Sequence, residues 1–295
     1  MRVGIVDVGS STVRLLVAAR EGRTLTAVRE DREHLHLGEE VERRGRLSPR
    51  AIAATARCVA EQARLAREAG VAEMRVLVTA PGRQSANGEE LVGAVARACG
   101  MPVRVLSAEE EGRLAFAGAL AGARRLAESL AVCDVGGGST EIVVGTPAGG
   151  PVWLRSLDVG CVRLAHRLLA DDPPGKRALA SARSEVERAL EGFAPPLPRA
   201  ALGTGGSARA LRKLVGGTLG EDELHAALAV LARRPSRRIA RSFTIDERRA
   251  RTLPAGALVL AALRRRLGVD LEVVRTGLRE GAALALLAEA EAAAA

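Results

Sequence analysis

The sequence predicts an α/β protein built from two similar halves, because one strand–turn–strand pattern occurs twice and helices alternate with strands after each copy. In the first copy an apolar run, Val3–Val6, leads into Asp7–Thr12, which reads DVGSST. In the second copy Leu130–Cys133 leads into Asp134–Glu141, which reads DVGGGSTE. A chain of 295 residues exceeds one typical domain. These observations favour a duplicated α/β architecture in which two lobes enclose a cleft.

The elements of the first half follow from apolar runs and their breakers. Ser48-Pro49 should begin a helix, because serine is a good N-cap and proline suits the first turn, and Gly70 should end it. Three acidic residues, Glu109–Glu111, complement a helix N-terminus, so each could be a simple capping residue. The predicted strands are 3–6, 13–19, 24–30, 75–78 and 102–106, with a polar loop at 79–88 and a helix at 89–98.

The second half repeats this plan after its own strand–turn–strand motif. Its predicted strands are 130–133, 142–145, 152–157, 201–202 and 271–275. Helices are expected over 161–169 and 184–192, separated by the loop DDPPG at 171–175, and most of the chain after 207 is expected to be helical. An alanine-rich helix over 279–295 ends the chain.

Composition limits the class of protein. Hydrophobic residues make up 47% of the chain, which is enough for packed cores, although aromatic residues supply only 1%. No apolar run reaches the roughly 20 residues of a membrane helix, and Asp7 interrupts the first strand where a secretory signal would continue, so we expect a cytoplasmic protein. The four cysteines lack C-x-x-C spacing and are expected to be buried free thiols.

The net charge of +9 comes almost wholly from arginine, and it favours a polyanionic partner over a cationic one. The stretch 233–251, RRPSRRIARSFTIDERRAR, concentrates this charge. One interpretation is that the stretch lines the route of a long polyanion. The other is a solvated helical face that follows the arginine bias of the chain, and the sequence leaves both open.

The glycine-rich turns predict phosphate binding, because glycine lets the backbone N–H groups approach a phosphate closely. The sequence contains no G-x-x-x-x-G-K-[ST] motif, and the first two turns lead into strands, which excludes an ordinary P-loop and a dinucleotide fingerprint. Clustered carboxylates of Asp7, Asp134 and Glu141 could hold Mg²⁺, a hard cation that prefers oxygen ligands. The predicted phosphate-binding residues are Gly9, Ser10, Ser11, Gly136, Gly137, Gly138, Ser139, Gly205, Gly206 and Ser207.

Eight sequence blocks together resemble one known family. The first four are DVGSSTVRLL at 7–16, VTAPGRQSAN at 78–87, SAEEEGR at 107–113 and DVGGGSTE at 134–141. In the same order follow SLDVGCVRL at 156–164, GTGGSARAL at 203–211, LPAGALVL at 253–260 and TGLREG at 276–281. Over essentially its whole length the chain resembles the exopolyphosphatase / guanosine pentaphosphate phosphohydrolase (Ppx/GppA) family.

The resemblance implies an actin-like, sugar-kinase-like fold with mixed five-stranded sheets and an active site in the interlobe cleft. We expect residues 1–120 to form the first lobe and 121–282 the second, with the helix 283–295 returning to the first. It further implies removal of terminal phosphate with Mg²⁺ or another divalent cation, K⁺ being an additional candidate, and a homodimer.

Residue by residue, the resemblance makes Glu111 the general base and places Asp134 and Glu141 at the metal and the water. Gly136 becomes the essential turn glycine, and Arg83 reaches the bound phosphate. A carboxylate beside other carboxylates would have a raised pKa, which suits a base near neutral pH. Departures from the family pattern are Ser11 for Asn, Gly112 for Ala, Ala80-Pro81 for Ser-Ala and His36 for Arg.

The leading hypothesis is therefore a two-domain exopolyphosphatase that takes no nucleic acid or membrane as partner. Hydrolysis of the 5′-phosphate of pppGpp is the alternative within the same reaction type. An actin-like sugar or acetate kinase would use the same turns with ATP. A polyphosphate or nucleotide sensor without turnover is the third class, although the set Glu111, Asp134 and Glu141 argues against it.

Overall fold

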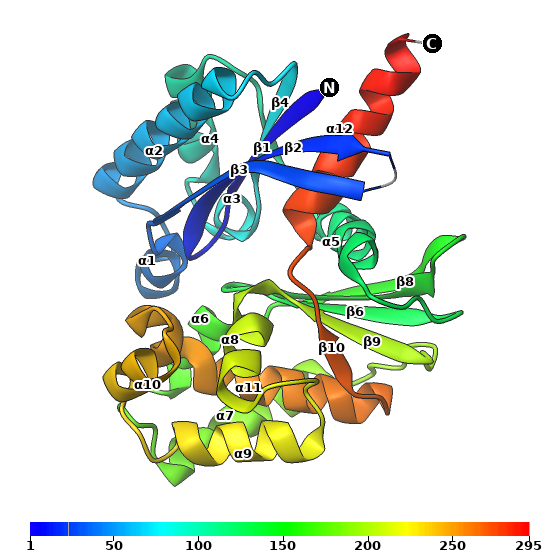
Figure 1. Ribbon diagram of the computed structural model, residues 1–295. Helices are drawn as coiled ribbons and strands as arrows, with labels where there is room; N and C mark the ends of the chain where they lie inside the picture. The colour runs from blue at the N-terminus through cyan, green and yellow to red at the C-terminus, as the bar shows by residue number, and fades with distance from the viewer. Residues whose placement is uncertain (23, 295) are drawn as a thin grey trace. The chain divides into compact units, whose positions relative to one another are not determined.

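The computed structural model describes residues 1–22 and 24–294, and the chain forms two compact units (Figure 1). The first unit consists of Met1–Ala121 together with the segment from Leu278 onward, and the second of Gly122–Gly277. Each unit contains one five-stranded sheet. Each unit also has its own hydrophobic core.

The sheet of the first unit has the strand order β3-β2-β1-β4-β5. β1 pairs antiparallel with β2 and parallel with β4, so the sheet is mixed. Six of the seven residues of β1 are buried, as expected for a central strand covered on both faces. The strands are β1 (Arg2–Val8), β2 (Thr12–Glu21), β3 (Thr24–His34), β4 (Glu73–Val78) and β5 (Val103–Val105).

Helices cover both faces of this sheet. On one face, Ile52, Val59 and Leu91 from α2 and α4 pack against strand residues. On the other face, Leu278, Leu286 and their neighbours in α12 pack against β1 and β2. The helices of this unit are α1 (Leu37–Arg44), α2 (Pro49–Glu68), α3 (Ala80–Gln84), α4 (Gly88–Cys99), α5 (Ala108–Gly122) and α12 (Leu278–Ala294).

The second unit repeats the same sheet, with β8-β7-β6-β9-β10 in the places of β3-β2-β1-β4-β5. Identical order and identical strand directions confirm the predicted duplicated, actin-like fold class. The strands are β6 (Leu130–Val135), β7 (Thr140–Thr146), β8 (Gly150–Leu157), β9 (Ala200–Thr204) and β10 (Leu271–Val273). The helices are α6 (Cys161–Leu168), α7 (Lys176–Ala189), α8 (Gly205–Val215), α9 (Glu221–Leu231), α10 (Ser236–Phe243) and α11 (Glu247–Leu267).

Several elements differ from the sequence prediction. The predicted loop 79–88 contains the short helix α3, because Pro81 lies in its first turn, where proline costs no hydrogen bond. Helix α7 begins at Lys176 rather than 184, since Ala182 and Val186 give it a buried stripe. Helix α1 was not predicted, and β10 ends two residues early. Ala295, in the last predicted helix, lies outside the described residues; among those described, no helix could span a membrane.

Candidate active site

The centre of the candidate site in the second unit is a pair of carboxylates on adjacent strands. Asp134 is the second-last residue of β6, Glu141 is the second residue of β7, and the two residues are direct partners in the antiparallel register. Opposed residues of an antiparallel pair project from the same face of the sheet, so two negative charges lie side by side. Glu141 is 1% exposed, and its Oε1 accepts a hydrogen bond from Ser156 Oγ at 2.9 Å. Such a like-charge pair favours binding of a cation.

The turn that joins these strands is held from one side by α6. The Gly136 carbonyl accepts from the Cys161 N–H at 2.9 Å, and the Gly137 carbonyl accepts from the Val162 N–H at 2.9 Å. In a trans peptide the N–H points away from the carbonyl, so the N–H groups of Gly137 and Gly138 point away from α6. This is the orientation in which backbone N–H groups can donate to a phosphate.

The third glycine-rich turn lies directly beside Asp134. Thr204 is the register partner of Asp134 in the parallel β6–β9 pair, and Gly205 follows it with φ +84°. A Cβ on Gly205 would lie 2.6 Å from Asp134 Oδ1, so only glycine fits there. The Thr204 hydroxyl donates to the Thr276 carbonyl at 2.7 Å instead of capping α8. The first N–H groups of α8 therefore have no side-chain cap and can donate hydrogen bonds to a bound anion.

Arg249 is a member of this site that the sequence motifs did not identify. It lies in the first turn of α11, and its Nη1 contacts Cys161 Sγ at 3.3 Å. A Cβ on Gly206 would lie 2.8 Å from Arg249 Nη2, so the guanidinium packs directly on the third turn. Among the described residues no carboxylate forms an ion pair with Arg249. A half-buried guanidinium against a glycine turn can bind a phosphate oxygen.

The first unit contains the equivalent turn with a different charge pattern. Asp7 on β1 is the register partner of Arg14 on β2, and Arg14 Nη2 donates to Asp7 Oδ2 at 2.6 Å. The Ser11 carbonyl accepts from the N–H groups of residues 35 and 36, and the Ser10 carbonyl accepts from the Gly38 N–H. The Ser11 N–H therefore points away from that segment. Asp7 is 1% exposed, and its Oδ1 has no hydrogen-bond partner among the described residues.

The two copies of the motif therefore differ in the residue that faces the aspartate across the strand pair. Asp7 faces an arginine, whereas Asp134 at the equivalent place faces Glu141. The first pair is internally neutralised, and the second has a formal charge of −2 from its two carboxylates. This difference makes the second unit the better candidate for a cation.

The three glutamates at the start of α5 have three different roles. Glu110 forms a capping box: its Oε2 accepts from the Ser107 N–H at 2.8 Å, which holds its pKa below the usual range. Glu109 is exposed and pairs with Arg113 one turn along the helix. Glu111 is 9% exposed and accepts from Arg83 Nη1 at 2.8 Å, so it is not a capping residue.

The structure thus brings two predicted catalytic residues, Arg83 and Glu111, into one ion pair in the first unit. Arg83 Nη1 also donates to the Leu106 carbonyl at 2.8 Å, which fixes the arginine at the end of β5. We expected carboxylate neighbours for Glu111, and its observed partner is a cation. The Arg83 guanidinium holds the Glu111 carboxylate in place beside the end of β5.

The donor set fits Mg²⁺. This ion binds proteins through one or two carboxylates and keeps water or substrate oxygens at its other positions, and Asp134 with Glu141 supplies two carboxylates. In the part of the chain that the structure describes, no three His, Cys, Asp or Glu side chains form a metal-binding group. Cysteine does not contribute, because burial raises the pKa of the neighbouring Cys133 thiol to about 12.

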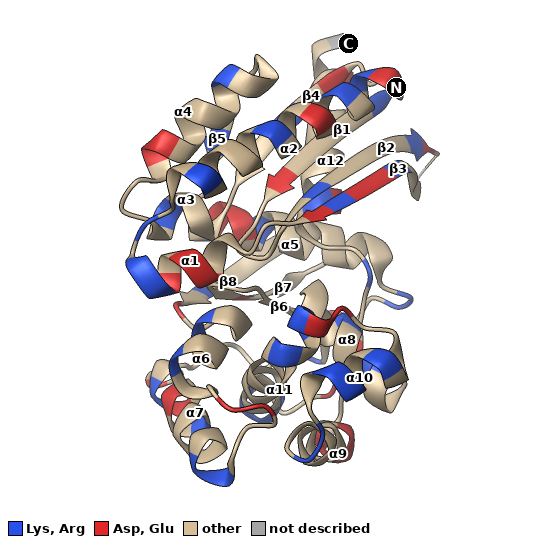
Figure 2. Ribbon diagram, turned by 90° about the vertical axis from the view of Figure 1, so that its left-hand side faces the viewer, with Lys and Arg blue, Asp and Glu red and all other residues tan. Residues whose placement is uncertain are grey.

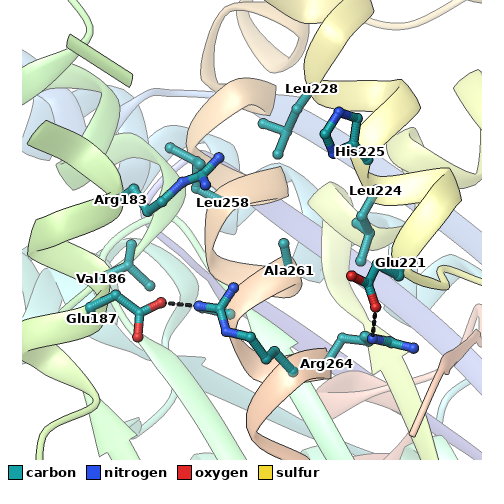
Figure 3. Close-up of a pocket in the computed structure, with 12 residues that line it drawn as sticks. Arg183, Val186, Glu187, Glu221, Leu224, His225, Leu228, Leu258, Ala261 and Arg264 are labelled. Atoms are coloured by element: carbon teal, nitrogen blue, oxygen red, sulfur yellow. Dashed lines mark hydrogen bonds and ion pairs between the residues drawn. The ribbon is translucent and has the colours of Figure 1, made fainter. Parts of the chain in front are cut away.

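A separate pocket of the second unit contains none of the predicted site residues (Figure 3). It lies among α7, α9 and α11 and has an apolar floor that includes Leu258 and Ala261. At its rim Glu187 pairs with Arg265, and Glu221 pairs with Arg264 at 2.7 Å. Both glutamates of this pocket are thus paired with arginines, and the pocket shares no residue with the glycine-rich turns.

Replacement of Gly160, the N-cap of α6, should disrupt the turn of the second unit. A Cβ there would lie 2.2 Å from the Gly137 carbonyl oxygen and 2.5 Å from the Gly138 nitrogen, both rigid backbone atoms. We expect Gly160→Ala to cost about 1–3 kcal/mol in urea unfolding and to abolish phosphate release. Gly93→Ala is the control, because its Cβ would contact only the flexible end of Arg97. Wild-type stability of Gly160→Ala would contradict the close approach.

The chain is similar to known proteins over most of its length. The model of the Ppx/GppA phosphatase family matches residues 16–290. Exopolyphosphatase 1 of Mycobacterium tuberculosis is 31% identical over 302 residues, covering 95% of this chain and 87% of that protein. The crystal structure of the Aquifex aeolicus Ppx/GppA family member is 27% identical and superimposes with a TM-score of 0.84 over 98% of both chains. An exopolyphosphatase from Cytophaga hutchinsonii, 18% identical with a TM-score of 0.88 over 98% of both chains, supports the fold alone.

Proposed function

We propose that this chain, which belongs to the Ppx/GppA phosphatase family, is an exopolyphosphatase that hydrolyses the terminal phosphate of inorganic polyphosphate. The observation that carries the proposal is the opposed pair Asp134 and Glu141, flanked by two glycine-rich turns. The names of the curated relatives support the same activity and substrate class.

In this proposal the residues have distinct roles in one reaction. The oxygen of a water molecule attacks the terminal phosphorus, the bond from phosphorus to the bridging oxygen breaks, and the water proton passes to the Glu111 carboxylate. Arg83, by pairing with Glu111, orients that carboxylate. Orthophosphate and a polyphosphate one unit shorter leave.

The turns and Arg249 supply the groups that stabilise negative charge on the transferring phosphate. Backbone N–H groups of Gly137, Gly138 and the start of α8 donate to phosphate oxygens, and such preorganised donors commonly provide the largest single contribution to catalysis. Asp134 and Glu141 would hold Mg²⁺, which when bound neutralises phosphate charge and orients the water. Asp7, paired with Arg14, fixes the turn at Gly9–Ser11.

The proposal is tested by phosphate release from tripolyphosphate, long polyphosphate, pppGpp and ATP at equal enzyme concentration. We expect release from both polyphosphates with kcat/KM above that for ATP. Higher kcat/KM on pppGpp than on either polyphosphate would assign the chain to the guanosine branch instead. Transfer from ATP to a sugar or acetate, without release to water, would assign it to the kinases.

A further inference from the structure

Helix α10 carries a concentration of arginine without matching acidic residues. Arg237, Arg238 and Arg241 are all exposed, and Arg233 and Arg234 precede them just before the helix. Within the described residues none of these five forms an ion pair. Figure 2 shows the corresponding blue segments on α10. Elsewhere exposed arginines often have a carboxylate partner, such as Arg64 with Glu61 at 2.6 Å.

The arginines occupy one side of the helix, and the other side is packed. Arg237 and Arg241 are four residues apart and Arg238 and Arg241 three apart, so they are neighbours on the helix surface. Ile239 is 1% exposed and Phe243 packs on the core of the unit, which sets the orientation of the helix. Three like charges at this spacing repel one another in the absence of a ligand.

Both ends of α10 are fixed, so the arginine face is preorganised. At its start the Ser236 N–H and hydroxyl donate to the Asp172 carboxylate at 2.8 and 2.6 Å. At its end Lys213 Nζ donates to the Thr244 carbonyl at 2.7 Å. The nearby acids Asp172 and Asp246 are thus used in capping helices rather than in neutralising the arginines. The helix that carries the arginines is therefore ordered before an anion binds, so binding requires no ordering of its backbone.

The same segment of chain leads directly to the candidate active site. From α10 the chain turns through Thr244 to Asp246 and enters α11, whose Arg249 packs on the third glycine turn beside Asp134. An eight-residue helix spans roughly 12 Å, so the arginine face extends well beyond the size of one phosphate. Its ligand should therefore be a polyanion with regularly repeated charges.

We infer that the exposed face of α10, formed by Arg237, Arg238 and Arg241, binds the body of a long polyphosphate whose terminal phosphate is hydrolysed. This inference rests on the proposed function and adds a preference for long chains to it. A triphosphate bound at the glycine turns is too short to use the whole face. The face therefore contributes to KM for long polyphosphate and little to the chemical step.

The test compares kcat/KM for tripolyphosphate and for a polyphosphate of several hundred units in the wild type and in Arg237→Gln/Arg238→Gln/Arg241→Gln. Exposed charge contacts are individually weak, so we expect a loss of about tenfold on the long substrate and less than about twofold on tripolyphosphate. The loss should come mainly from KM and should shrink between about 50 mM and about 200 mM salt. The control variant Arg50→Gln/Arg57→Gln/Arg97→Gln removes three exposed charges that form no ion pair with a described residue. It should not lower kcat/KM for one substrate more than for the other.

The outcomes separate the inference from the function on which it rests. If the wild type hydrolyses both substrates and the α10 variant has the same ratio of kcat/KM for the long and the short substrate, the inference fails and the proposed function stands. If the wild type releases phosphate from neither, the proposed function fails, and the inference with it. If the control variant lost as much kcat/KM on long polyphosphate as the α10 variant, the loss would come from the lower net charge of the protein, and the inference would fail. Tighter binding of single-stranded RNA than of long polyphosphate to the same arginines would also overturn the inference.

Discussion

Asp134→Asn is expected to lower phosphate release by at least about 10³-fold while leaving the fold intact. The change removes one charge from the Asp134–Glu141 pair and almost no volume. Opposed like charges destabilise a strand pair by about 0.2–1 kcal/mol, so without metal the variant should melt at the same temperature as the wild type or up to about 3 °C higher. Loss of activity without loss of stability distinguishes a functional carboxylate from a structural one.

A second readout follows the cation without using turnover. A ligand that binds only the folded state raises the melting temperature, so Mg²⁺ should stabilise the wild type but not Asp134→Asn. Asp171→Asn, an exposed acid of the same unit, should retain both the activity and the Mg²⁺ response. Near wild-type phosphate release by Asp134→Asn would remove this residue from the site.

The duplicated fold could be predicted from the sequence because its signals are local. Apolar strands, glycine turns and helix caps depend on neighbouring residues, and the Ser48 hydroxyl indeed caps α2 by accepting from the Ala51 N–H. Register was harder to predict. Asp7 and Asp134 each follow an apolar strand and precede Val-Gly, and the strand pairing shows that one faces Arg14 and the other Glu141.

Contacts between distant segments account for most of what the motifs missed. Arg249 touches Cys161 across 88 positions of sequence and belongs to an arginine-rich stretch in which no single residue stands out. The sequence did contain one indication of this contact at the other partner. Gly206 follows another glycine, and a glycine can mark a place where a side chain, here that of Arg249, comes close to the backbone. Likewise, composition alone makes each of Glu109, Glu110 and Glu111 a possible helix cap. The family resemblance singles out Glu111, and burial together with the Arg83 contact sets it apart from the other two in the structure.

Glu111→Gln should lower kcat by about 10²–10⁴-fold with a change of only a few-fold in KM. Glutamine keeps the shape of the side chain and can still accept from Arg83 Nη1, but it cannot take a proton from water. Glu109 lies on the same helix, is exposed and pairs with Arg113, so the Glu109→Gln variant should have wild-type kcat and KM. The pair of variants separates proton transfer from a general loss of negative charge on α5.

The pH profile of the same variant gives the sharper test of the base. Catalysis requires the ionised Glu111, so wild-type kcat/KM should fall as the pH drops and the carboxylate is protonated. In Glu111→Gln this acidic limb should disappear from the residual activity. An unchanged limb, or a raised KM with unchanged kcat, would make Glu111 a residue that positions Arg83 for phosphate binding rather than the base.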